Sequence, residues 1–195
     1  MKMKPCTMIA ALLAALVAAG CTTTSNTATP AAASGAAMSK RQTIDAGVDE
    51  ALARLYREAR GSRELIAKSK GVLVFPSVLA AGLVVGGEYG EGALREGGRT
   101  SGYYRTASGS FGLQAGAQSK AIVLVFMTQE ALDRFRNSSG WTAGVDANVA
   151  LIKVGADGSI DTKTAQADVA GFVMTNAGLM VNVSLQGTKI SRLDL

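Results

Sequence analysis

Residues 70–76 read KGVLVFP, and at this stretch the chain changes from helical to extended character. The apolar residues 72–75 lie between a glycine and a proline, as in a short buried strand that the proline ends. Tyr103 and Tyr104 are adjacent on a later predicted strand, so their side chains should face opposite sides of the sheet. Trp141 is expected in the core. The other predicted strands are residues 83–85, 102–105, 111–118, 121–127, 141–154, 172–174, 179–185 and 189–193. Because glycine inside strands marks bends and bulges, we expect a strongly curved, largely antiparallel Gly-rich sheet or small barrel.

Helices are predicted before this sheet and once within it. Apolar residues recur on one helical face at Ile44, Val48, Leu52 and Leu55. Ser39 and Gln42 have the spacing of a capping box at the start of this helix, and Gly61 is expected to end it. Ser62 is expected to cap a second short helix through residue 68, and Thr128 a third at residues 129–137. The fold class is therefore predicted to be α+β, with short N-terminal helices packed on the curved sheet.

The first 21 residues have the layout of a secretory signal. Lys2 and Lys4 precede an uncharged apolar run, residues 8–19, which is shorter than the roughly 20 residues of a membrane-spanning helix. The run ends in small residues and Cys21, whose thiol can accept a diacylglycerol. We predict a lipoprotein signal peptide at residues 1–20, a flexible tether with lipidated Cys21 at residues 21–38, and one domain at residues 39–195. The alternative is an ordinary signal peptide followed by a chance cysteine.

The residue after Cys21 indicates in which of two bacterial membranes a lipoprotein is anchored. Lipoproteins retained in the inner membrane of double-membrane bacteria commonly carry Asp there, whereas this chain has Thr22. The likeness to lipoproteins thus implies a protein anchored in the outer membrane and facing the periplasm. Residues 1–20 contain two lysines and no acidic residue, so their removal lowers the net charge from +5 to +3. This charge does not predict nucleic acid binding.

No residue pattern predicts catalysis, a metal or a cofactor. The chain has no histidine, and its only cysteines are Cys21 and one in the signal peptide, so thiolate and histidine chemistry are excluded from the domain. The glycine cluster at residues 86–92 lacks the Gly-Lys-Ser/Thr of a phosphate loop, and a bulged hairpin explains it better. Ser110 has no partner at a spacing that indicates a base, although a lysine base such as Lys120 or Lys153 stays possible in principle. The acidic pair Asp157 and Asp161 lacks the later glutamate of a calcium loop. We expect a protein that is not an enzyme.

Three blocks of sequence, in order, are similar to one known family. They are KGVLVFP at residues 70–76, AGLVVGGEYGEG at residues 81–92 and GSFGLQAGAQ at residues 109–118. Together with NAGL at residues 176–179 and VSLQG at residues 183–187, they resemble the SYLF domain over roughly residues 40–195. The resemblance implies lipid binding: eukaryotic members bind phosphoinositides, partly through an N-terminal amphipathic helix, and some bind actin. Between two bacterial membranes, the resemblance implies anionic phospholipid instead.

The basic residues of the first helix are the candidate lipid contacts. Residues 40–70 contain eight basic and five acidic side chains. Each Lys or Arg near an anionic membrane contributes about 1 kcal/mol, and a lipid tether would raise the effective concentration. The predicted contacts are Lys40, Arg41, Arg54, Arg57 and Arg60. The alternative is a helix packed on the sheet with a solvated charged face, in a structural or protein-interaction domain that binds an envelope protein and no lipid.

Overall fold

The computed structural model of the chain describes residues 30–82, 85–111, 118–155, 157–161, 166–180 and 183–195. The predicted signal peptide and Cys21 lie outside the described residues, as do residues 112–117 of the strand expected at 111–118. The described helices are α1 (Pro30–Glu58), α2 (Ser62–Lys68) and α3 (Gln129–Asn137). The described strands are β1 (Gly71–Gly82), β2 (Val85–Glu96), β3 (Arg99–Phe111), β4 (Gln118–Phe126), β5 (Trp141–Thr142), β6 (Val149–Leu151), β7 (Val169–Thr175), β8 (Gly178–Leu179) and β9 (Lys189–Arg192).

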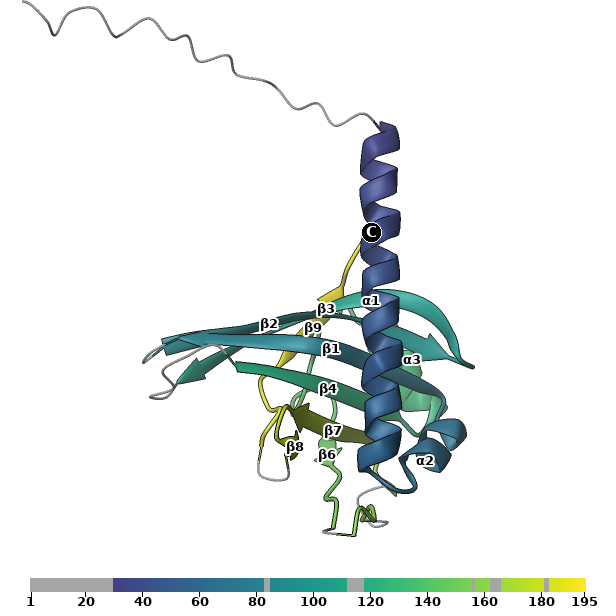
Figure 1. The fold of residues 1–195 in the computed structure, drawn as a ribbon, viewed down its shortest axis with the longest axis vertical. Coiled ribbons are helices and arrows are strands. Elements are labelled where there is room, and N and C mark those ends of the chain that lie inside the picture. The colour runs from purple at the N-terminus through teal and green to yellow at the C-terminus, as the bar shows by residue number, and fades with distance from the viewer. Residues whose placement is uncertain (1–29, 83–84, 112–117, 156, 162–165, 181–182) are drawn as a thin grey trace, which may run out of the picture.

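Helix α1 is longer than the sequence predicted, because it begins at Pro30 rather than at Ser39. Residues 30–38 of the predicted tether are therefore helical. Five of these nine residues are alanine, the strongest helix former, and proline is tolerated in a first helical turn. The first buried side chain in the described part of α1 is that of Ile44, so the N-terminal turns project beyond the sheet (Figure 1).

The junction between α1 and α2 differs from the prediction in one detail. Gly61 has a left-handed backbone (φ 84°), as expected of the residue that separates two helices. Ser62, however, does not cap α2. Its buried hydroxyl donates to the carbonyl oxygens of Ala59 (2.7 Å) and Leu55 (3.3 Å), so it satisfies the C-terminal end of α1 instead. The predicted cap of α3 is confirmed, since the side chain of Thr128 accepts from the backbone nitrogen of Ala131 at 3.3 Å.

Strand β1 continues past Pro76, where the sequence predicted its end. Its pairing with β2 shifts register between Val74 and Ser77, and its pairing with β4 shifts between Phe75 and Val78. This is a β-bulge, which places a proline where no backbone N–H is needed for the ladder. The bulge also changes which residues face each side of the sheet, so Val78 packs in the same cluster as Leu73 and Phe75.

The nine described strands form one sheet in the order β5-β9-β3-β2-β1-β4-β7-β6, with β8 paired to β7. All pairs are antiparallel except β6 with β7. The sheet curls strongly into a half-barrel (Figure 1), which confirms the predicted α+β class and curved, largely antiparallel sheet. The glycine-rich residues 86–92 lie within β2, so the prediction of a hairpin there is wrong. Gly90 and Gly92 are needed because a Cβ on either would lie under 3.0 Å from atoms of β1.

Both faces of the central strands are buried, each in its own core. On the α1 face, Val48 and Leu55 pack with Val74 of β1 and their neighbours on β4 and β7. On the opposite face, called the α3 face here, Phe135 and Trp141 pack with strand residues that point the other way. Trp141 is buried as predicted, and Tyr104 faces the α3 core while Tyr103 faces α1. The uninterrupted apolar run of β4 follows from this two-sided burial.

Candidate functional site

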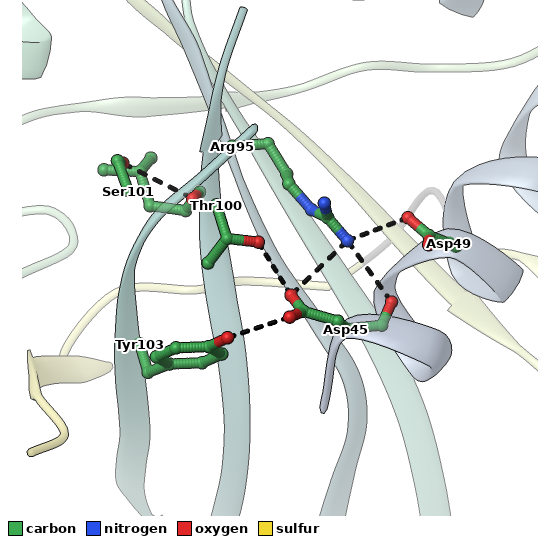
Figure 2. Close-up of polar contacts among 7 residues, drawn as sticks. Asp45, Asp49, Arg95, Thr100, Ser101 and Tyr103 are labelled. Atoms are coloured by element: carbon green, nitrogen blue, oxygen red, sulfur yellow. Dashed lines mark hydrogen bonds and ion pairs between the residues drawn. The ribbon is translucent and has the colours of Figure 1, made fainter. Parts of the chain in front are cut away.

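Helix α1 is fixed across the sheet by a polar cluster around Asp45 (Figure 2). The carboxylate of Asp45 accepts from the hydroxyls of Thr100 (2.7 Å) and Tyr103 (2.8 Å), both on β3. Arg95 of β2 donates to the backbone oxygen of Asp45 at 3.3 Å and to the Asp49 carboxylate at 2.8 Å. Burial, and then the hydrogen bond to Asp45, raise the pKa of the Tyr103 hydroxyl. The N-terminal half of α1 is therefore held against β2 and β3.

Lys40, a predicted lipid contact, forms an ion pair within the fold. Its ammonium lies 2.7 Å from the Glu91 carboxylate on β2, which also accepts from the Tyr89 hydroxyl at 2.8 Å. Burial opposes ionisation of Glu91, but hydrogen bonds from Lys40 and Tyr89 outweigh it and lower the pKa of that carboxyl. The hydrogen bond to Glu91 likewise raises the pKa of Lys40. The Lys40 side chain is still 42% exposed, so the pair lies at the surface.

Arg54 is also engaged, at the other end of α1. Its guanidinium pairs with Glu58 at 2.6 Å and donates to the backbone oxygen of Thr175 on β7. These contacts fix the C-terminal half of α1 to the far side of the sheet from β3. Arg54 is therefore placed as a structural contact between helix and strand.

The other three predicted contacts are exposed but do not share a face. Arg41 lies near Tyr103, where its charge opposes the raised pKa of that hydroxyl. Arg57 is 16 residues further along α1, which is about 24 Å at 1.5 Å per residue and about 160° around the helix. Arg60 follows α1, with its backbone bonded to Gly158. The structure thus separates the five predicted residues into two ends of α1.

Exposed basic residues also lie on β3 and β9, on the face of the sheet that α1 covers. Arg105 on β3 is opposite Glu91 in the ladder, and Lys189 on β9 is opposite Ala107. Within the described residues, neither of these two forms an ion pair, and neither does Arg41. Arg192, also on β9, is opposite Tyr104 and so faces the α3 side, where its charge opposes the raised pKa of the Tyr104 hydroxyl. We call the α1-side set the proximal basic surface, which comprises Lys40, Arg41, Arg105 and Lys189. The sequence analysis missed the two strand residues because their place on this face depends on the register of the sheet.

A second basic surface lies at the opposite end of strands β1 to β3, between α1 and α2. Two adjoining hollows share Asp49, Leu52 and Tyr56. The guanidinium carbon of Arg63 lies 4.3 Å from the centre of the Tyr56 ring, a cation–π contact. Three exposed basic residues line these hollows and form no ion pair in the described part of the chain. We call this the distal basic groove, and its basic residues are Arg57, Arg63 and Lys70.

The described residues allow two of the candidate chemical sites to be checked. They contain no group of three or more acidic, Cys or His side chains that could hold a metal ion. Lys120, the conceivable base for Ser110, is paired with Glu88 at 2.8 Å, and the Ser110 side chain lies outside the described part. None of the helices in the described ranges combines the length and apolar character needed to cross a membrane.

Comparison with known proteins identifies a family for part of the chain. The family model described as Ysc84, Las17-binding protein actin regulator, matches residues 107–194. The matched segment contains the third sequence block and both later ones, and it covers the C-terminal end of β3 and all the described strands after it. No curated protein matches the chain.

Proposed function

Residues 107–194 place the chain in the Ysc84 family of SYLF domains, and from this premise we propose that it is a non-enzymatic, lipid-anchored module that contacts anionic phospholipid. Cys21 would carry the lipid and hold the domain at the outer membrane, facing the periplasm. The family description names an actin regulator. For a chain that begins with a lipoprotein-like signal, a phospholipid surface is the partner that fits its compartment.

The observation that carries this proposal is where α1 begins. The ten residues from Pro30 to Ser39 extend about 15 Å at 1.5 Å per residue, and they project past the β3 side of the sheet (Figure 1). The predicted lipid at Cys21 precedes these turns. A membrane at that end of α1 would therefore be nearest to Lys40 and Arg41 of the proximal basic surface, whereas Arg57 of the distal basic groove lies about 24 Å further along α1 than Arg41.

The charge of the proximal basic surface supports an electrostatic contact. Arg41, Arg105 and Lys189 are exposed and form no ion pair within the described residues, while Lys40 is largely neutralised by Glu91. At about 1 kcal/mol for each basic residue near an anionic surface, these three residues would contribute about 3 kcal/mol. A lipid tether would strengthen this contact further, because it makes the contact intramolecular.

Co-sedimentation with vesicles tests the proposal, using residues 22–195, which contain every described helix and strand. We expect binding to anionic vesicles at low salt, loss of this binding at high salt, and none to neutral vesicles. The proximal variant carries Arg41→Glu, Arg105→Glu and Lys189→Glu, and it should not bind. The matched control carries Arg57→Glu, Arg63→Glu and Lys70→Glu, which change the net charge equally in the distal basic groove, and it should bind like the parent.

The second candidate function is a structural or protein-interaction domain of the envelope. The observation that favours it is the internal use of Lys40 and Arg54, since both are bound to groups of the fold itself. In that case residues 22–195 would bind neither kind of vesicle, and pull-down from envelope extract would recover a protein partner that the anchored chain also binds.

A further inference from the structure

The distal basic groove consists of two cationic hollows that meet at an apolar wall. One hollow carries the exposed basic side chains of Arg57 and Arg63, and the adjoining hollow carries that of Lys70. Leu52 and Tyr56 of α1 line both hollows. An apolar surface is therefore flanked by positive charge in each of two directions.

The three exposed basic residues are not neutralised by the fold. In the described part of the chain, Arg57, Arg63 and Lys70 form no ion pair. Glu50 of α1 and Glu64 of α2 are exposed, but neither lines a hollow. Each hollow is thus open to an anionic group from outside the chain.

Asp49 also lines both hollows, and Arg95 of β2 matches its charge. The Arg95 guanidinium lies 2.8 Å from the Asp49 carboxylate and 3.4 Å from that of Asp45, which lines neither hollow (Figure 2). With both carboxylates counted against Arg95 and the three exposed basic residues, the local net charge is still positive. A ligand of opposite charge therefore complements the groove.

Arg63 is already oriented for an acidic ligand. Its guanidinium carbon lies 4.3 Å from the centre of the Tyr56 ring, so the stack holds the guanidinium by its face. The N–H groups lie in the guanidinium plane and stay available, and this planar fork can donate two parallel hydrogen bonds to a carboxylate. Arginine and tyrosine are also among the residues that most often carry the affinity of protein interfaces.

From this arrangement we infer that the distal basic groove binds an acidic peptide segment of a protein partner, with an apolar side chain between two acidic ones. The apolar side chain would pack on Leu52 and Tyr56, and one carboxylate would enter each hollow. The residues of α1 that line the groove run from Asp49 to Arg57, which is about 12 Å. In an extended peptide, alternate residues share a face and lie about 7 Å apart, so acidic residues at positions i and i+4 flank an apolar residue at i+2 over about the same length.

The position of the groove favours a protein over the anchoring membrane. With the anchor proposed at Cys21, the N-terminal turns of α1 face the membrane, and Arg57 lies about 24 Å further along the helix than Arg41. The groove lies between the C-terminal half of α1 and α2 (Figure 1). A protein in the aqueous compartment would reach it while the lipid holds the chain. Only this step rests on the proposed anchor.

Titration of isotope-labelled residues 22–195 with the peptide Glu-Ser-Leu-Ser-Glu, followed by nuclear magnetic resonance, tests the inference. We expect saturable shifts of the amide signals of residues 49–57 and 63–72, which line the groove. The permuted peptide Leu-Ser-Ser-Glu-Glu has the same composition and charge. It should bind at least about tenfold more weakly, because its leucine no longer lies between the two carboxylates.

Two variants with equal changes in net charge locate the contact. The groove variant carries Arg57→Gln, Arg63→Gln and Lys70→Gln, and it should lose at least about tenfold in affinity for the first peptide. Its unfolding temperature should stay near that of the parent, because these side chains are exposed. The control variant carries Arg41→Gln, Arg105→Gln and Lys189→Gln, and its affinity should stay within a few-fold of the parent.

Four results would overturn the inference: no saturable shifts in the groove, equal affinity for the two peptides, equal losses in the two variants, or loss of vesicle binding in the groove variant. The last would identify phospholipid as the occupant. Vesicle binding by the parent is measured separately. A parent that binds anionic vesicles but not the first peptide would overturn this inference alone, and the reverse would overturn only the proposed phospholipid contact.

Discussion

Removal of the Asp45 carboxylate should loosen α1 from the sheet. In Asp45→Ala, the hydroxyls of Thr100 and Tyr103 lose a charged acceptor, and each such hydrogen bond contributes about 1.5–3 kcal/mol. The Asp45 side chain is 32% exposed, so water replaces part of this, and alanine adds about 0.5 kcal/mol of helix propensity. We expect a net loss of about 2 kcal/mol, which lowers the unfolding temperature by about 4–8 °C for a domain of this size.

Thermal and urea unfolding followed by circular dichroism measure this effect. The matched control is Asp49→Ala, because Asp49 shares Arg95 with Asp45 but is 70% exposed and should cost less than about 1 kcal/mol. Tyr103→Phe should have a smaller effect in the Asp45→Ala background than in the parent, since both changes remove one interaction. If Asp45→Ala costs no more than Asp49→Ala, the cluster does not hold α1 in place.

Three further predictions concern other parts of the chain. Gly92→Ala should destabilise the fold by at least about 1–3 kcal/mol in urea unfolding, because the new Cβ would overlap the Val74 carbonyl oxygen; stability equal to the parent would contradict the close approach of β1 and β2. The lowered pKa of Glu91 adds stability that is present above its ordinary value and is lost as the pH falls through the folded-state value. The difference in unfolding temperature between the parent and Glu91→Gln should therefore shrink under acidic conditions, and a difference that grows would show the opposite sign of the shift. Cys21→Ser should abolish lipidation of the full chain in the cell, seen as loss of the lipid mass and of the outer-membrane fraction, whereas unchanged membrane attachment would contradict an anchor at this residue.

The helices and most strands were predictable because local signals and burial agree. The 3.6-residue recurrence of Ile44, Val48 and Leu55 gave the packed face of α1, and Thr128 gave the start of α3. The extent of β1 was not predictable from Pro76, because a proline ends a strand unless a bulge removes the need for its N–H. The unbroken apolar run of β4 fits a strand that is buried on both faces. Only the fold shows which helix covers which face.

The candidate site was harder to predict than the fold. Lys40 and Arg54 have the same sequence character as Arg41 and Arg57, yet the fold pairs the first two and leaves the second two exposed. The difference depends on acceptors that are distant in sequence, such as Glu91 on β2. A count of charges on a helix cannot show such partners, because they are set by the register and curvature of the sheet.

The affinity of residues 22–195 for anionic vesicles, measured for the parent and for the two charge-matched variants, tests the central claim most directly. If three basic residues of the proximal basic surface contribute about 1 kcal/mol each, the variant with Arg41→Glu, Arg105→Glu and Lys189→Glu should lose at least about 100-fold in affinity. The distal variant should stay within a few-fold of the parent. Equal losses in both variants would mean that only net charge matters, and a loss confined to the distal variant would place the lipid contact between α1 and α2.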